Sequence, residues 1–242
     1  MVKQQNNESA KIYISGDIVS DRWYEEETSA ASFKKDLDDL GDVSDIELHI
    51  NSGGGSVFDG IAIFNMLKAN KANITVHVDA LAASIASVIA MAGDKIIMPS
   101  NSMLMIHNPW TYTAGNAKQL RKQADDLDQI GKASRQSYLT KAGDSLTEDK
   151  LIELLDDETW LTAEEAVSYG LADEIEEASQ VAASIDSDFM QKYKNVPKQL
   201  ASNTASEKLK QEELQERQEI IERSRNSRKS LEAFLDTKIY KN

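Results

Sequence analysis

The sequence predicts an α/β fold with mostly parallel sheets and crossover helices, followed by a C-terminal region of different character. Stretches of alternating apolar residues repeatedly precede stretches with apolar residues at helical spacing. Strands that alternate with helices in this way form parallel sheets through right-handed crossovers. The 242 residues are enough for one sizeable domain and an appendage.

The first elements follow this order. Residues 11–18 alternate in hydropathy and turn at Gly16, which predicts a strand. Residues 28–40 place apolar side chains on one helical face and stop before Gly41, a good residue to follow a helix. Residues 46–50 alternate again and predict the next strand.

A glycine-rich connection at residues 51–56 joins this strand to a helix at 57–67. Three consecutive glycines bring backbone N–H groups close to whatever lies above them, because no side chain intervenes. The connection lacks the Lys-Ser/Thr of a P-loop and the spacing of a dinucleotide fingerprint. By itself it is equally consistent with a plain tight turn.

The centre of the chain is the stretch 76–93. An apolar alternation at 74–78 stops at Asp79, and an Ala-rich apolar helix then continues to Gly93. Ser84 falls at the start of that helix, where unpaired N–H groups favour a developing negative charge. A serine in a buried helix is most often a packing residue, so this position alone does not identify a nucleophile.

Two short apolar runs follow, at 95–98 and 103–106, and the second delivers His107 to the tip of a strand. Residues 116–140 predict a long helix with too few apolar residues to be buried within one domain. We expect this helix to project and to meet another copy of the chain. A helix from about residue 147 and a shorter one with a capping box at Thr162 complete the domain.

The composition excludes several classes of protein. The chain has no cysteine and three histidines, so disulfides, thiolate catalysis and a metal cluster are not expected. The net charge of −14 is concentrated in residues 1–180, which carry −16, and disfavours nucleic acid as a partner. No apolar run is long enough to span a membrane, and the first residues lack a signal-peptide core, so we expect a cytoplasmic protein.

Residues 181–242 differ from the preceding domain. They carry a net charge of +2, contain a polar cluster at 202–206 and continue into a charged helix at 207–236 with a sparse apolar stripe. We therefore predict a domain at 1–180 and a linker with a charged helical tail at 181–242. The tail contributes none of the candidate site residues.

Four linked motifs resemble, in order and spacing, the proteolytic subunit of the Clp protease, ClpP. They are INSGGGSV at 50–57, AASIA at 82–86, MIHNP at 105–109 and AEEAVSYGLAD at 163–173. The resemblance extends over about residues 11–176. It implies a ClpP/crotonase-type fold with a projecting handle helix, and a serine peptidase that needs no cofactor.

The resemblance also implies roles for individual residues. Ser84 would be the nucleophile and His107 its general base. The family's oxyanion donors fall on the backbone N–H groups of Gly54 and Ile85, and a substrate strand would pair near residues 56–57, that is, Ser56 and Val57. His49 and His77 lie within strands, and we interpret them as structural.

Two positions depart from the family's pattern. The family has proline where this chain has Gly53, which predicts a more mobile loop. The family's catalytic aspartate falls on Glu158, with Asp157 one residue earlier as the substitute. A glutamate can orient an imidazole, but its extra methylene requires a different backbone position.

Within the family, residues 55–67, residues 158–163 and the appendage are most similar to the ClpP-type head maturation (prohead) proteases of tailed phages. That resemblance implies cleavage of capsid or scaffold proteins during virion assembly, in the host cytoplasm or inside the procapsid. The alternative is the proteolytic subunit of a bacterial Clp protease that works with an AAA+ ATPase. In either case the resemblance implies a ring-shaped homo-oligomer, a heptamer or stacked heptamers.

Functions of other classes remain alternatives. Crotonase-like acyl-CoA enzymes share the fold and the paired N–H site, but they need neither Ser84 nor His107. Signal-peptide-peptidase relatives carry a similar glycine loop and use a Ser-Lys dyad, so the segment around His107 argues against them. A non-catalytic assembly protein with this fold is the third alternative.

Overall fold

The computed structural model describes residues 3–4, 9–24, 27–178, 193 and 195–197. The chain separates into two compact units, Met1–Val196 and Pro197–Asn242, and the candidate site lies within the first. Most of the predicted linker and tail, 181–242, lies outside the described residues. The domain boundary after residue 180 therefore stays a prediction.

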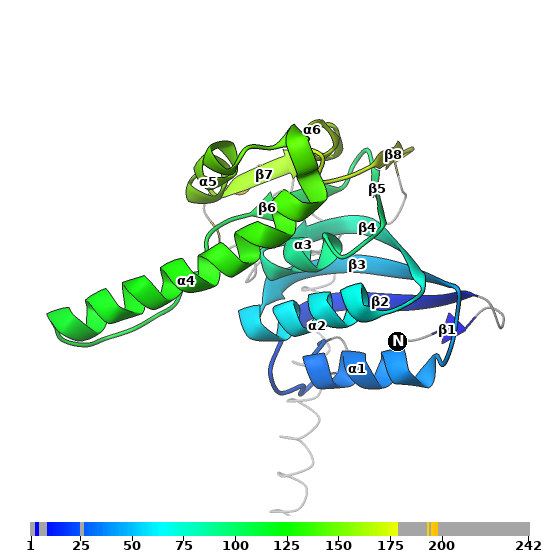
Figure 1. The fold of residues 1–242 in the computed structure, drawn as a ribbon, viewed down its shortest axis with the longest axis horizontal. Helices are drawn as coiled ribbons and strands as arrows, with labels where there is room; N and C mark the ends of the chain where they lie inside the picture. Colours follow the sequence, from blue (N-terminus) through cyan, green and yellow to red (C-terminus); the bar gives the residue numbers. More distant parts are fainter. Residues whose placement is uncertain (1–2, 5–8, 25–26, 179–192, 194, 198–242) are drawn as a thin grey trace, which may run out of the picture. The chain divides into compact units, whose positions relative to one another are not determined.

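The first unit has the predicted α/β fold with a mostly parallel sheet (Figure 1). The strand order is β1-β2-β3-β4-β5-β8, and β6 pairs with both β4 and β7. All pairings are parallel except β1 with β2 and β6 with β7. The strands are β1 (Lys3–Gln4), β2 (Ser9–Ile18), β3 (Asp45–Gly55), β4 (Asn73–Ala83), β5 (Lys95–Pro99), β6 (Met103–Ile106), β7 (Thr159–Thr162) and β8 (Glu174–Glu176).

Helices connect these strands as crossovers. Figure 1 shows α1, α2 and α3 on one side of the sheet, and α4 extending away from it. The helices are α1 (Ala30–Asp39), α2 (Val57–Ala69), α3 (Ile85–Ala90), α4 (Ala117–Ala142), α5 (Glu148–Asp156) and α6 (Ala163–Ser168), with a 3₁₀ turn at Gly143–Ser145. Within the described part of the chain, none of the helices combines the length and the apolar character that crossing a bilayer requires.

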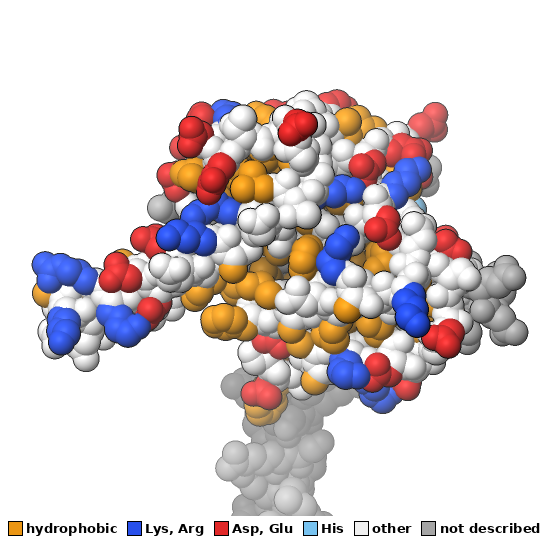
Figure 2. Space-filling view, in the orientation of Figure 1, with side chains coloured by type: hydrophobic (Ala, Val, Ile, Leu, Met, Phe, Trp, Pro, Cys, Tyr) orange, Lys and Arg blue, Asp and Glu red, His pale blue; other side chains and the backbone are white. Residues whose placement is uncertain are grey.

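The long helix α4 confirms the predicted handle. It begins after Asn116, whose side chain accepts hydrogen bonds from the N–H groups of Lys118 and Gln119, and it runs for 26 residues. Figure 2 shows charged side chains along its outer half. Of its residues, only Gly131, Tyr138 and Ala142 are buried, because the helix packs on the domain only through its second half.

The core forms on the helix side of the sheet because side chains alternate along each strand. In β3, for example, Ile46, Leu48 and Ile50 are fully buried, whereas the intervening Glu47 and His49 face the other side and are half-buried. The same alternation holds in β2 and β4. The sheet therefore has one apolar face under the helices and one polar face.

Two strands are longer than the sequence predicts. β3 continues through the glycine-rich segment to Gly55, because Asp17 and Ile18 of β2 pair with its last residues. β4 continues past Asp79 to Ala83, because its end pairs with β6. The predicted connection after residue 50 and the predicted strand end at Asp79 are thus wrong in extent, since partners distant in sequence decide where pairing stops.

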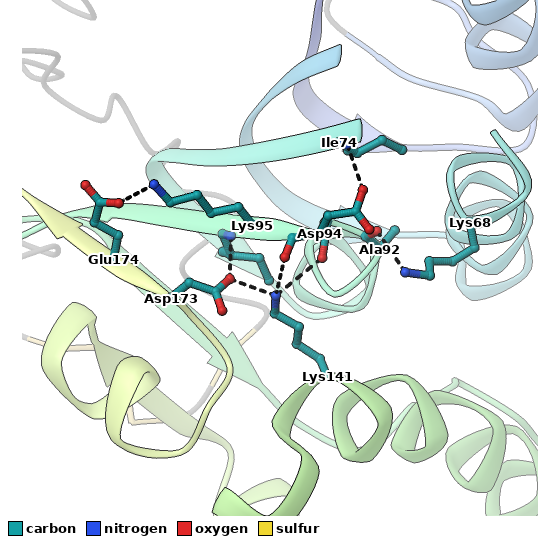
Figure 3. A network of polar contacts seen from close by, with 10 residues as sticks. Lys68, Ile74, Ala92, Asp94, Lys95, Lys141, Asp173 and Glu174 are labelled. Atoms are coloured by element: carbon teal, nitrogen blue, oxygen red, sulfur yellow. Dashed lines mark hydrogen bonds and ion pairs between the residues drawn. The ribbon is translucent and has the colours of Figure 1, made fainter. Parts of the chain in front are cut away.

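A polar network attaches the second half of α4 to the sheet (Figure 3). The ammonium group of Lys141 donates to the backbone oxygens of Gly93 and Asp94, at 3.4 and 3.2 Å, and to the carboxylate of Asp173 at 2.7 Å. Asp173 also accepts a hydrogen bond from the Ile96 N–H at 2.6 Å. The side chain of Lys141 is only 11% exposed, so this network fixes the helix against the turn before β5.

Candidate active site

Ser84 lies at the junction between β4 and α3, as the sequence predicts. Its backbone is held on both sides: its N–H donates to Met105 O at 2.8 Å, and its carbonyl oxygen accepts from Ser87 Oγ at 2.6 Å. The φ of Ser84 is 55°, a conformation that costs free energy for a residue with a side chain. Such strain persists where the surrounding structure fixes the backbone, and here it directs the hydroxyl out of the core.

His107 lies next to this hydroxyl. It follows β6 directly, and its Nε2 is 2.7 Å from Ser84 Oγ. Burial lowers the pKa of His107 from 6.5 to about 4, so the ring is neutral at neutral pH. A neutral ring with Nε2 unprotonated can accept the proton of the Ser84 hydroxyl.

The two candidate acids lie beside the histidine. In the antiparallel pairing of β6 with β7, Ile106 is opposite Thr159; His107 directly follows this last pair on one strand, and Glu158 directly precedes it on the other. Asp157 ends α5, and both acids line a cavity of about 540 Å³ together with His107. The role of Glu158, or of Asp157 in its place, stays a prediction.

The glycine-rich end of β3 passes directly over Ser84. A Cβ built on Gly54 would lie 2.7 Å from both Ala83 O and Ser84 Cβ, so only glycine fits there, and its φ of 95° also favours glycine. This close approach brings Gly54 next to the Ile85 N–H at the start of α3. The N–H groups of the first helical turn have no acceptor within the helix, which leaves Ile85 as a possible oxyanion donor.

The N–H of Gly54 already has a hydrogen-bond acceptor. It donates to Ser52 Oγ at 3.1 Å, and Ser52 Oγ in turn donates to Gly16 O at 2.6 Å. In this structure the Gly54 N–H is therefore directed at Ser52 and away from the cavity. Its predicted role as an oxyanion donor stays a prediction, and requires that the peptide group turns.

The two predicted substrate-binding residues have different surroundings. Val57 lines a cavity of about 220 Å³ together with Ser84 and His107. Ser56 caps α2: its N–H donates to Ile18 O at 2.7 Å and its hydroxyl to Asp59 at 2.5 Å. The Ser56 N–H is thus already bonded, and pairing of a substrate strand at these residues stays a prediction.

Tyr193 lies near the site, although no sequence motif predicts it there. It belongs to the stretch predicted as a linker, yet its hydroxyl donates to Gly53 O at 2.8 Å. Its ring packs edge-on against His107 and Trp160, with centroid distances of 5.3 and 6.2 Å. Burial raises the pKa of Tyr193 to about 12, against the opposite effect of a hydrogen bond with the Ser84 side chain, so the hydroxyl stays protonated.

Comparison with known proteins identifies a family for most of this domain. A sequence model of the Clp protease family matches residues 8–179. The ATP-dependent Clp protease proteolytic subunit 1 of Synechococcus sp. (strain CC9902) is 35% identical over 141 residues, which are 57% of this chain and 71% of the relative.

Two further relatives are similar to the same extent. The ATP-dependent Clp protease proteolytic subunit 3 of Rhodococcus jostii (strain RHA1) is 32% identical over 133 residues, covering 54% of this chain and 65% of the relative. The ATP-dependent Clp protease proteolytic subunit of Bacteroides fragilis (strain ATCC 25285) is 32% identical over 142 residues, covering 57% and 67%. The matched part of the chain thus spans about two thirds of each relative.

The buried environment of His107 leads to a prediction about its titration. In an NMR titration of the three histidines, we expect the His107 ring to take up its proton near pH 4, and the Tyr193→Ala variant to shift that midpoint upward because water reaches the ring. The control variant Tyr24→Ala, at an exposed tyrosine, should leave the midpoint unchanged. A midpoint near 6.5 for the unmodified chain would contradict the burial argument.

Proposed function

Because the chain belongs to the Clp protease family, we propose that it is a serine endopeptidase in which Ser84 is the nucleophile and His107 the general base. Membership of this family implies a serine peptidase. The observation that carries the assignment of residues is the 2.7 Å contact between Ser84 Oγ and Nε2 of the neutral His107 ring, on a backbone strained at Ser84.

The proposed reaction uses groups of the chain alone. Ser84 Oγ attacks the scissile carbonyl carbon while His107 Nε2 takes the hydroxyl proton, and a tetrahedral oxyanion forms. His107 returns the proton to the leaving amine, and water then hydrolyses the acyl-enzyme by the same sequence. The oxyanion would be stabilised by the N–H groups of Ile85 and, after its peptide group turns, Gly54. Glu158 would orient the imidazole and stabilise its cationic form.

The named relatives favour one setting for this activity. They are ATP-dependent Clp protease proteolytic subunits of bacteria, and ClpP proteins form rings that work with AAA+ ATPases. We infer that this chain is likewise the proteolytic subunit of such an assembly. The projecting α4, with the exposed Leu120 on it, is a suitable element for contact with a neighbouring copy.

A second setting is head maturation in a tailed phage, with capsid or scaffold proteins as substrates. One observation favours it: the chain continues for 63 residues past the family match, and this extension is charged and largely polar. The two settings differ in a measurable way. Degradation of a folded protein only in the presence of ATP and an AAA+ partner supports the first, and cleavage of a capsid or scaffold protein without ATP supports the second.

Replacement of Ser84 tests the activity itself. Ser84→Ala removes one hydroxyl from a small-residue helix end, so we expect a folded protein whose peptidase kcat/KM falls about a thousandfold or more. A fluorophosphonate probe should label the unmodified chain at one residue and leave Ser84→Ala unlabelled. Ser168→Ala, on the surface, serves as the control. Retained activity or labelling in Ser84→Ala would exclude Ser84 as the nucleophile.

The third member of the site is tested by a pair of variants. We expect Glu158→Gln to lower kcat/KM much more than Asp157→Asn, because Glu158 directly precedes Thr159, whose partner Ile106 directly precedes His107. Each substitution removes a charge with little change in shape. The reverse order of effects would assign the orienting role to Asp157.

A further inference from the structure

The peptide group between Gly53 and Gly54 has a defined orientation at the site. The carbonyl oxygen of Gly53 and the N–H of Gly54 point in opposite directions because the peptide is trans. Tyr193 donates to that carbonyl oxygen at 2.8 Å, and Ser52 Oγ accepts from that N–H at 3.1 Å. Tyr193 lines one cavity together with Gly53, Gly54 and Ser84, whereas Ser52 is not among its lining residues, so the peptide directs its carbonyl toward the cavity-lining Tyr193 and its N–H toward Ser52.

This orientation is unfavourable for hydrolysis. A carbonyl oxygen carries partial negative charge, and at this position it would face the oxyanion that forms on the substrate, where hydrogen-bond donors are needed. Rotation about ψ of Gly53 and φ of Gly54 would reverse the group and bring the Gly54 N–H toward the cavity. Glycine permits such a rotation at low cost because it has no Cβ.

Building on the proposed function, we propose that Tyr193 is a positioning residue that holds the Gly53–Gly54 peptide in this orientation and keeps the site in a resting state. Further contacts hold Tyr193 in place. The tyrosine ring packs between His107 and Trp160, and two residues further on Asn195 Nδ2 donates to Asp157 O at 3.0 Å. When the Tyr193 side chain leaves, one constraint on the peptide and one occupant of the cavity are removed together.

Two substitutions of Tyr193 separate these effects. Tyr193→Phe keeps the ring and removes the hydroxyl, with its bonds to Gly53 O and to the Ser84 side chain. We therefore expect kcat for a short peptide and the rate of fluorophosphonate labelling to rise about 2- to 10-fold, with KM little changed. Tyr193→Ala also empties the cavity, so we expect a similar rise in kcat with a lower KM. Tyr24→Phe, at an exposed tyrosine, is the matched control.

The outcomes distinguish this inference from the proposed function. If the unmodified chain is labelled at Ser84 and Tyr193→Phe is no faster, Tyr193 does not position the peptide and the inference fails alone. If neither the unmodified chain nor any Tyr193 variant is labelled or hydrolyses peptides, the proposed function fails as well. A rise in Tyr193→Phe that disappears when Ser84→Ala is added supports both.

A separate cluster lies on the polar face of the sheet, away from this site. His49 of β3 is directly opposite His77 of β4 in the parallel register, and their rings stack with centroids 4.8 Å apart. Glu47 lies two residues before His49 on the same face. One donor atom from each of these three residues lies within 4.8 Å of the other two.

The hydrogen bond at Nδ1 of His49 decides which ring nitrogen is unprotonated. Asp79 Oδ1 is 2.8 Å from Nδ1 of His49, so the carboxylate accepts and Nδ1 carries the proton. Nε2 then carries the lone pair; it is buried, it has no hydrogen-bond partner, and it is 3.9 Å from Glu47 Oε2. Metal-binding histidines commonly donate a hydrogen bond from one ring nitrogen to a carboxylate, while the other ring nitrogen binds the metal. His49 has this arrangement, with Asp79 as the carboxylate.

We infer that Glu47, His49 and His77 form a site for a divalent transition-metal ion of the Zn²⁺ class. Two imidazoles and one carboxylate are ligands that Zn²⁺ prefers, and they leave a fourth position open. Ligands at about 2 Å from an ion lie closer together than these donors do, so binding requires small rotations of the rings. Glu47 also has to leave the ion pair that it forms with Lys11.

The composition makes this site easy to test. The full chain has no cysteine, and His107 is its only other histidine, so Co²⁺ and Zn²⁺ titrations followed by visible absorption and calorimetry report on few candidate ligands. We expect His77→Ala to abolish the tetrahedral Co²⁺ spectrum, Asp79→Asn to weaken binding about 10- to 100-fold, and His107→Gln to leave it unchanged. Lys11→Met should strengthen binding, because it frees Glu47.

Opposite results would overturn the metal site. Binding that is equally strong in His77→Ala, or that is lost in His107→Gln, would place the ion elsewhere. No Co²⁺ or Zn²⁺ binding by the unmodified chain and by Lys11→Met would exclude the site altogether. A rise in the melting temperature with Zn²⁺ for the unmodified chain, absent in His77→Ala, provides a readout that is independent of peptidase activity.

Discussion

The site depends on one close backbone approach, that of Gly54 to the turn at Ser84. Because no side chain separates them, the end of β3 lies directly against the junction of β4 and α3. That contact is possible only because β3 and β4 are parallel neighbours whose ends come together at the same edge of the sheet. Ser84, the glycine-rich strand end and the first turn of α3 are positioned by this single constraint.

The rest of the domain supports this edge. The third strand of the arrangement, β6, pairs with the end of β4 and delivers His107 within 2.7 Å of Ser84 Oγ, and β7 pairs with β6 and delivers the two candidate acids. Lys141 attaches α4 to the sheet where β5 and β8 begin, and Ser134 and Tyr138 of the same helix line a pocket with Ser84 and His107. The handle is therefore anchored both at the start of β5 and beside the site.

The proposed control by Tyr193 acts at this same edge of the sheet, on the Gly53–Gly54 peptide. A peptide between two glycines can adopt either orientation at low steric cost, and here the Tyr193 hydroxyl and Ser52 Oγ both hold it in one of them. Residue 193 lies beyond the family match at 8–179, so the proposed control involves a residue outside the region that identifies the family. The polar face of the sheet, with His49 and His77, is independent of both.

The sequence by itself determined the order of strands β2 to β6 and of the helices, the handle and the placement of Ser84 and His107 at element ends, because these follow from local periodicity and from short motifs; it did not indicate the short strands β1, β7 and β8. Tertiary structure alone decided the longer β3 and β4, the orientation of the Gly53–Gly54 peptide and the adjacency of His49 and His77. Each of these depends on pairing or packing between segments far apart in the chain, up to the 140 residues that separate Tyr193 from Gly53. No local pattern records such contacts, since they form only when the sheet assembles.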